Sequence, residues 1–202
     1  MPDPVTLKGQ ITGFVLAGGK STRMGKDKAV LTLRGRTLLE HALATLRLVT
    51  PEVFVLGARE LYGNCGAEVV EDIFPGCGPL AGIHAALSHS NTRFNLVIAV
   101  DTPFLSPEFL RYMAERAVSS GAAVTTPEIA GYRQPLCSVY ARDFLPIADE
   151  ALKRPGSRDS GGNQAKSTDY KIVPLFPRDR TLVISEADMA QFAFTPEMFD
   201  NL

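Results

Sequence analysis

Short apolar runs alternate with longer segments of helical periodicity along most of the chain. Apolar runs occupy Phe14–Ala17, Val53–Leu56 and Leu96–Val100, and weaker ones lie at Glu68–Val70 and Ala122–Thr126. Runs of this length, bounded by glycine, proline or polar residues, are typical of buried strands rather than of helices. The pattern therefore predicts strands at these five places.

Between these runs, apolar residues recur at the spacing of one helix face. The segment 38–46 carries such a face after Thr37, a residue type that commonly caps a helix start. A second helix is predicted from Ser106 as N-cap and Pro107 as its first residue, with an apolar face that ends before Gly121. A third apolar helix is predicted through residues 83–87.

This alternation of buried strands and helices predicts the fold class. We expect an α/β protein with a three-layer, Rossmann-like arrangement, in which a mostly parallel sheet has helices on both faces. The chain length of 202 residues fits one domain spanning residues 1–202. Ligands in such sheets bind beyond the carboxyl ends of the strands.

The stretch 153–180 departs from the pattern. It is rich in glycine, serine and proline, and it contains seven Lys or Arg residues against three Asp. Much of it is predicted to be a mobile loop.

Composition and charge narrow the function classes. The net charge of −1 argues against a nucleic-acid-binding protein, because such domains usually carry a basic excess. The longest apolar run has five residues, far short of the roughly 20 that span a bilayer, so we expect no membrane association and a cytoplasmic location. The three cysteines, with no Cys-x-x-Cys spacing, suggest reduced thiols rather than disulfides or a zinc site.

The segment after the first predicted strand carries the strongest chemical signal. Gly18 and Gly19 are followed by four basic side chains up to Lys28. Glycines let backbone N–H groups approach an anion, and Arg and Lys supply charged donors, which together suit a phosphate-binding loop. The spacing does not fit the P-loop pattern, because Phe14 stands where its first glycine is required. A solvated polar loop is the alternative reading.

Three motifs, taken together, resemble one enzyme family. The string Leu16-Ala-Gly-Gly-Lys-Ser-Thr-Arg-Met-Gly-Lys-Asp-Lys28 is followed by Glu71-Asp72 and Pro75-Gly-Cys-Gly-Pro-Leu-Ala-Gly82, and then by Asp101-Thr-Pro-Phe104. Gln134-Pro-Leu136 fits the same order. This set is similar to the nucleotidyltransferases of the molybdenum cofactor guanylyltransferase (MobA) type.

The resemblance implies site residues. The nucleotide would be held by Leu16, Ala17, Gly18, Gly19, Lys28, Asp72, Gly78, Pro79 and Leu80, with Lys28 on its phosphates and Asp72 at the base or ribose. The catalytic residues would be Arg23, Lys28 and Asp101, and Asp101 would bind Mg²⁺. Carboxylate oxygens at a strand end suit that hard cation. From the residues alone, Asp101 also fits a turn aspartate, and the loop 76–82 fits a tight strand-to-helix connection.

The resemblance also implies the reaction. GMP would pass from GTP to the terminal phosphate of molybdenum-molybdopterin, with release of pyrophosphate. Protein partners would deliver or receive the cofactor. A phosphomonoester is largely anionic at neutral pH, because its second pKa is near 6, so no general base is required. Gln134 and the basic stretch 153–180 are candidates for binding the anionic acceptor.

Two other functions remain open from the sequence. A cytidylyltransferase of the same superfamily usually has Ala-Ala where this chain has Ala17-Gly18. A nucleotide-binding regulator without turnover would fit Leu56, since many relatives carry a small polar residue there, and a C-terminal end that contains Thr195-Pro196 but lacks the family's asparagines. The glycine- and serine-rich 155–165 segment is a third departure from the family pattern.

Overall fold

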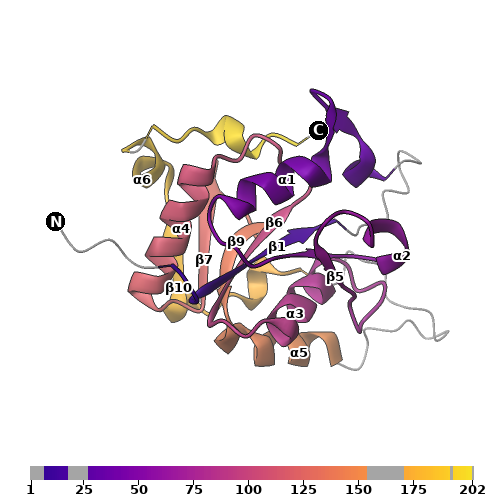
Figure 1. Cartoon of the computed structure of the whole chain (residues 1–202). Coiled ribbons are helices and arrows are strands. Elements are labelled where there is room, and N and C mark those ends of the chain that lie inside the picture. The colour runs from indigo at the N-terminus through magenta and orange to yellow at the C-terminus, as the bar shows by residue number, and fades with distance from the viewer. Residues whose placement is uncertain (1–6, 18–26, 154–170, 192, 202) are drawn as a thin grey trace.

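The computed structural model describes residues 7–17, 27–153, 171–191 and 193–201, and Figure 1 shows their arrangement. The helices are α1 (Leu38–Arg47), α2 (Arg59–Tyr62), α3 (Pro79–His89), α4 (Pro107–Ser120), α5 (Leu145–Lys153) and α6 (Glu186–Ala190). The strands are β1 (Ile11–Leu16), β2 (Thr32–Leu33), β3 (Arg36–Thr37), β4 (Val53–Leu56), β5 (Glu68–Val70), β6 (Phe94–Ala99), β7 (Val124–Ile129), β8 (Tyr132–Arg133), β9 (Cys137–Ala141) and β10 (Thr181–Ile184).

The main sheet is mixed but mostly parallel. Its strand order is β10-β7-β9-β6-β1-β4-β5, and β8 pairs with β7. Parallel pairs join β1 to β4 and β6, β4 to β5, and β7 to β10. Within this strand order of the described residues, β9 is antiparallel to both of its neighbours, β6 and β7. The predicted α/β fold class is therefore confirmed.

Helices cover both faces of this sheet, as predicted. Figure 1 shows α1 and α4 above the sheet and α3 and α5 below it. The alternating side chains of β1 divide between these layers, since Ile11 and Val15 pack with α1 and α4, whereas Phe14 and Leu16 pack with α3 and α5. All six residues of β1 are buried, which explains its nearly continuous apolar sequence.

Most sequence-predicted elements are confirmed with shifted ends. Strand β1 begins at Ile11 rather than Phe14, β6 begins at Phe94 rather than Leu96, and β7 runs from Val124 rather than Ala122. Residues 154–170 of the predicted mobile loop lie outside the described residues. The remainder, 171–180, includes two short 3₁₀ helices (Val173–Leu175 and Arg178–Arg180) before β10.

Helix α1 shows the capping that its sequence predicts. The Thr37 hydroxyl accepts a hydrogen bond from the Glu40 backbone N–H at 3.1 Å, and the Glu40 carboxylate accepts one from the Thr37 N–H at 2.7 Å. This reciprocal pair satisfies two of the donors left unpaired at a helix start. The apolar face behind it, from Leu38 to Leu46, is buried.

Replacing Thr37 by alanine is expected to destabilise the protein by about 1 kcal/mol, because the helix start loses its side-chain acceptor. Urea denaturation followed by circular dichroism would measure the change in the free energy of unfolding. Thr37→Ser keeps the hydroxyl and is the matched control, with little expected change. Equal stability of the alanine and serine variants would contradict the capping role.

Helix α3 approaches β1 closely through a glycine. A Cβ atom on Gly82 would lie 2.4 Å from Cδ1 of Leu16, which is well inside van der Waals contact. Glycine therefore allows the start of α3 to pack against the carboxyl end of β1.

Within the described residues, no helix has the length and apolar character needed to cross a membrane.

Candidate functional site

The carboxyl ends of β1, β4 and β6 meet at one edge of the sheet. The carbonyl of Leu16 accepts a hydrogen bond from the Val100 N–H at 3.1 Å, and the Ala17 N–H donates to the Leu56 carbonyl at 3.0 Å. These bonds extend the ladder past the last residue of each strand. The N–H of Ala17 is therefore paired with β4 and is not available to a nucleotide.

Lys28 and Asp101 meet at this edge although they are 73 residues apart in the chain. The Lys28 ammonium donates to Oδ2 of Asp101 at 2.8 Å, and their side chains are 28% and 23% exposed, respectively. Lys28 opens a 3₁₀ helix (Lys28–Val30), and Asp101 follows β6. The structure thus brings together the two charged residues predicted to face the triphosphate and the metal.

The turn after β6 is closed by a neighbouring residue and not by Asp101. The Thr102 hydroxyl donates to the Ala99 carbonyl at 2.9 Å. In the described part of the chain, Oδ1 of Asp101 accepts no hydrogen bond, and Oδ2 accepts only from Lys28. The Asp101 carboxylate is therefore not needed for the turn, and it stays partly accessible to a ligand.

The connection from β5 to α3 holds four further candidates. Gly78 has φ +66° and ψ −157°, a conformation that essentially only glycine adopts, and it is the N-cap of α3. Pro79 is the first residue of α3, and the side chain of Leu80 is fully buried. Leu80 could therefore contact a nucleotide only through its backbone. The strand-to-helix connection and the binding role are compatible readings of these residues.

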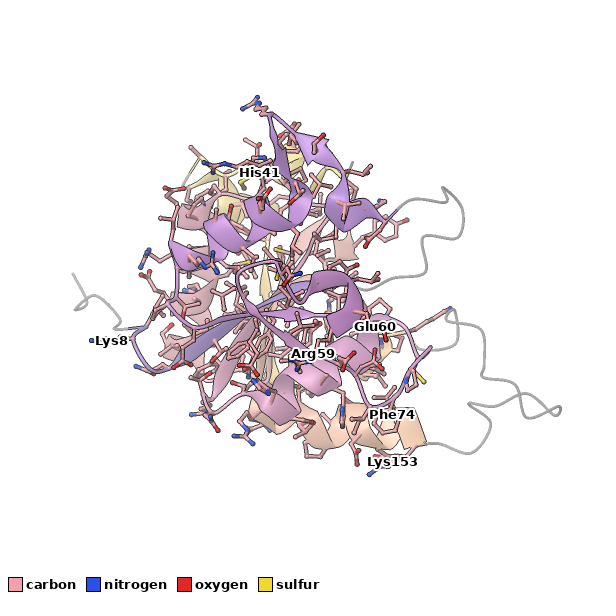
Figure 2. All side chains as sticks on the ribbon, turned by 45° about the vertical axis from the view of Figure 1, so that its right-hand side comes forward. Lys8, His41, Arg59, Glu60, Phe74 and Lys153 are labelled. Carbon is pink, nitrogen blue, oxygen red and sulfur yellow. The ribbon has the colours of Figure 1, made fainter. Side chains whose placement is uncertain are left out.

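Asp72 lies on the same connection and is exposed at the surface. Desolvation by surrounding protein raises the pKa of its carboxyl above the ordinary value; Glu71 adds to this, and a hydrogen bond from the Phe74 backbone opposes it. Among the described residues, no hydrogen bond or ion pair joins Asp72 to Lys28 or Asp101. Figure 2 labels Phe74 on this connection, below Arg59 and Glu60 of α2.

Gln134 lies between β8 and β9 in a hydrogen-bonded turn. Its N–H donates to the Pro127 carbonyl at 2.9 Å, and its carbonyl accepts from the Ser138 hydroxyl at 2.7 Å. The Leu136 carbonyl accepts from the N–H of Ala99, at the end of β6, at 2.7 Å. This contact places the Gln134–Leu136 turn beside the strand that leads to Asp101.

Three predicted site residues, Gly18, Gly19 and Arg23, lie outside the described residues. One residue of the site's surroundings was missed by sequence reasoning. The buried hydroxyl of Tyr62 lies 2.6 Å from Oδ2 of Asp27 and 3.1 Å from the Ala17 carbonyl. No motif marked Tyr62, because it contacts Asp27 across 35 residues of sequence.

Other expectations about metals and thiols can be compared with the structure. The three cysteines are free thiols. Among residues 7–17, 27–153, 171–191 and 193–201, no group of three or more His, Cys, Asp or Glu is placed to hold a metal ion alone. Leu56 is a core residue with 1% exposure, packed in the apolar layer beside α3. The apolar Leu56 side chain therefore cannot make the hydrogen bond that a small polar residue at this position would offer a nucleotide.

The arrangement suits a ligand that carries several negative charges and a cation. An ammonium and a carboxylate lie together at the carboxyl edge of a parallel sheet, where such folds bind ligands. The ammonium can pair with phosphate oxygens, and the carboxylate can bind the cation.

The sequence of this chain is similar to those of known proteins. The family model of the MobA-like NTP transferase domain matches residues 13–166 of this chain. A probable molybdenum cofactor guanylyltransferase of Pelotomaculum thermopropionicum is 34% identical over 194 residues, covering 96% of this chain and 87% of the relative. One from Mycobacterium bovis is 36% identical over 195 residues, covering 93% and 94% of the two chains.

A solved structure agrees with these relatives. The molybdopterin-guanine dinucleotide biosynthesis protein A from Archaeoglobus fulgidus aligns with a TM-score of 0.75 and 26% identity, covering 95% of this chain and 91% of that one. The sequence motifs, the fold and the similar proteins all indicate the same family, and the similarities cover most of the chain. The chain therefore belongs to the family of MobA-like NTP transferase domains, whose reaction is nucleotidyl transfer.

Proposed function

We propose that this protein transfers GMP from GTP to the terminal phosphate of molybdenum-molybdopterin and releases pyrophosphate, forming the guanine dinucleotide cofactor. The observation that carries the proposal is the Lys28–Asp101 pair at the carboxyl edge of the sheet, in a chain of this family. The guanylyltransferase relatives supply the nature of the donor and acceptor.

The residues present fit a bound Mg²⁺. Mg²⁺ is usually held by one or two carboxylates together with substrate phosphates and water, so a large protein cage is not required. Asp101 offers an accessible carboxylate, with Oδ1 free of hydrogen bonds from the described residues. The metal, when bound, would neutralise charge on the triphosphate and the leaving pyrophosphate.

Lys28 and Asp101 would have different partners with a nucleotide bound. In the structure each side chain neutralises the other at 2.8 Å. A triphosphate would offer phosphate oxygens to the Lys28 ammonium, and the Asp101 carboxylate would then hold the accompanying cation.

The transfer step is a substitution at the α-phosphorus of GTP. An oxygen of the acceptor phosphate forms the new P–O bond, and the bond to pyrophosphate breaks. The acceptor is already anionic at neutral pH, so the protein aligns the reactants and neutralises charge rather than removing a proton. We assign charge neutralisation at the triphosphate to Lys28 and Arg23, and binding of the acceptor phosphate to Gln134 and the basic segment 153–180.

The remaining proposed contacts recognise the nucleoside. We assign contacts with the nucleotide to the backbone of Leu16, Ala17, Gly18 and Gly19 and to the β5–α3 connection with Gly78, Pro79 and Leu80. Asp72 would bind the base or ribose. The proposal also includes a cytoplasmic location and protein partners that supply or receive the cofactor.

Nucleotide selectivity is the first test. With Mg²⁺ present, GTP is expected to raise the melting temperature more than CTP or ATP does. A nucleotide that binds only the native state stabilises it more the more tightly it binds, and the proposed function requires the tightest binding for GTP. A nucleotide at 100 times its Kd adds about 2.7 kcal/mol to stability, which differential scanning fluorimetry detects easily. Stronger stabilisation by CTP would assign the protein to the cytidylyltransferases.

A further inference from the structure

Tyr62 contacts both ends of the chain segment that separates β1 from Lys28. It is the last residue of α2, and only 4% of its surface is exposed. Its hydroxyl lies 2.6 Å from Oδ2 of Asp27 and 3.1 Å from the carbonyl of Ala17. One side chain, on a third element, therefore lies between the end of β1 and the residue before Lys28 and contacts both.

The chemistry of this contact favours a firm bond to Asp27. The phenol has one proton, and the shorter of its two contacts goes to a carboxylate, which is the stronger acceptor. Burial, with the hydrogen bond to Asp27 adding to it, raises the pKa of the Tyr62 hydroxyl above its ordinary value. Tyr62 therefore stays protonated, and able to donate, throughout the neutral pH range.

Asp27 passes this constraint to Lys28 through its second oxygen. Oδ1 of Asp27 accepts from the Ala29 N–H at 3.0 Å and so caps the 3₁₀ helix that Lys28 opens. The Lys28 ammonium then reaches Asp101 at 2.8 Å. Each link in this series is a hydrogen bond between described residues, and together they fix the start of the helix that presents the ammonium.

We propose that Tyr62 is a positioning residue for nucleotide binding, which acts through Asp27 to hold Lys28 where it meets the triphosphate. The inference rests on the proposed function and assigns a role to a residue outside the sequence motifs. Tyr62 does not touch the nucleotide in this account. A bystander role would predict a loss of stability alone, whereas positioning predicts a loss of affinity that depends on Lys28.

A double-mutant cycle separates these two roles. The affinity for GTP with Mg²⁺ would be measured by isothermal titration calorimetry for the wild type, Tyr62→Phe, Lys28→Ala and the double variant. Tyr62→Phe is expected to weaken binding about 10-fold in the wild-type background and less than about 2-fold when Lys28 is already alanine, because coupled residues are not additive. Equal losses in both backgrounds, or no loss in the first, would overturn the proposal.

Tyr140→Phe is the matched control. Tyr140 is fully buried, and its hydroxyl donates to the Pro135 carbonyl at 2.7 Å. This variant removes a comparable buried hydroxyl, so it is expected to lower the melting temperature without changing GTP affinity. A drop in affinity equal to that of Tyr62→Phe would show a general effect of lost stability and would overturn the proposal.

Asp27→Asn tests the same link if Tyr62→Phe folds poorly. It removes the charge that Tyr62 donates to, and its effect on GTP affinity is expected to be lost in the Lys28→Ala background. An effect that persists undiminished there would overturn the proposal. Failure of the wild type to bind GTP would overturn the proposed function itself, whereas normal GTP binding with unaffected variants would overturn only the role of Tyr62.

Discussion

Asp101→Asn is expected to lower guanylyl transfer at least about 100-fold, since removal of one group that stabilises transition-state charge typically costs 10²–10³ in kcat. Asparagine keeps the size of the side chain and removes the negative charge that binds the cation. Asp101 is partly exposed, and the turn beside it is closed by Thr102, so the fold is expected to remain intact. Steady-state kinetics with saturating Mg²⁺ and GTP would measure the loss.

The same variant is expected to change GTP binding in opposite directions with and without the metal. Without Mg²⁺, binding should tighten, because a negative charge facing the triphosphate has gone and the Lys28 ammonium is released from its partner. With Mg²⁺, binding should weaken. Asp143→Asn, which removes a surface carboxylate paired with Arg180, is the matched control and should leave both affinities unchanged. Near-normal transfer by Asp101→Asn would show that the metal is bound elsewhere.

Lys28→Ala is the second large expected effect. The substitution removes the ammonium and leaves the Asp101 carboxylate unpaired in front of a polyanion. We expect kcat/KM for GTP to fall about 100-fold, which corresponds to about 2.7 kcal/mol of lost transition-state stabilisation. Because phosphate contact contributes to both binding and transfer, KM should rise and kcat should fall. Initial rates over a range of GTP concentrations would separate the two.

Two control variants make the Lys28 prediction specific. Lys28→Arg keeps the positive charge and should lose much less activity than Lys28→Ala. Lys8→Ala removes an exposed lysine that precedes β1, at the opposite edge of the sheet from Lys28, and should have no effect; Figure 2 labels this residue. A loss in Lys8→Ala as large as in Lys28→Ala would indicate that net charge, rather than the pair with Asp101, determines activity.

The central part of the fold was predictable because most residues of its strands are buried. Strands β1, β4 and β6 each contain a short uninterrupted apolar run, and α1 and α4 carry caps and one apolar face. The polar or glycine residues Thr12, Gly13 and Asn95 explain why β1 and β6 begin earlier than predicted. Strand β9 was not predicted, because Ser138 interrupts its apolar sequence. That hydroxyl is buried against the Thr126 hydroxyl at 2.8 Å, a contact that only the tertiary structure reveals. Strand β10 and helix α5 were likewise missed.

The site residues that belong to sequence motifs were predictable. The contacts between them, and residues that act only through tertiary contacts, were not. Lys28 and Asp101 were identified from the family resemblance, but their direct contact depends on the adjacency of β1 and β6. The hydrogen bond from the Ala17 N–H to the Leu56 carbonyl of β4 follows from strand pairing and was not evident from the sequence. Tyr62 carried no sequence signal, since its role arises from a contact across 35 residues. The nucleotide and metal contacts assigned to individual residues remain predictions.

The most direct test of the account is the transfer reaction itself. The purified protein would be incubated with Mg²⁺, molybdenum-molybdopterin and GTP labelled at the α-phosphate, and product and pyrophosphate would be quantified together. The account predicts label in a guanine dinucleotide and one pyrophosphate for each molecule formed, with no comparable product from CTP. GTP binding without pyrophosphate release would instead indicate a nucleotide-binding regulator, and preferential use of CTP would contradict guanylyl transfer.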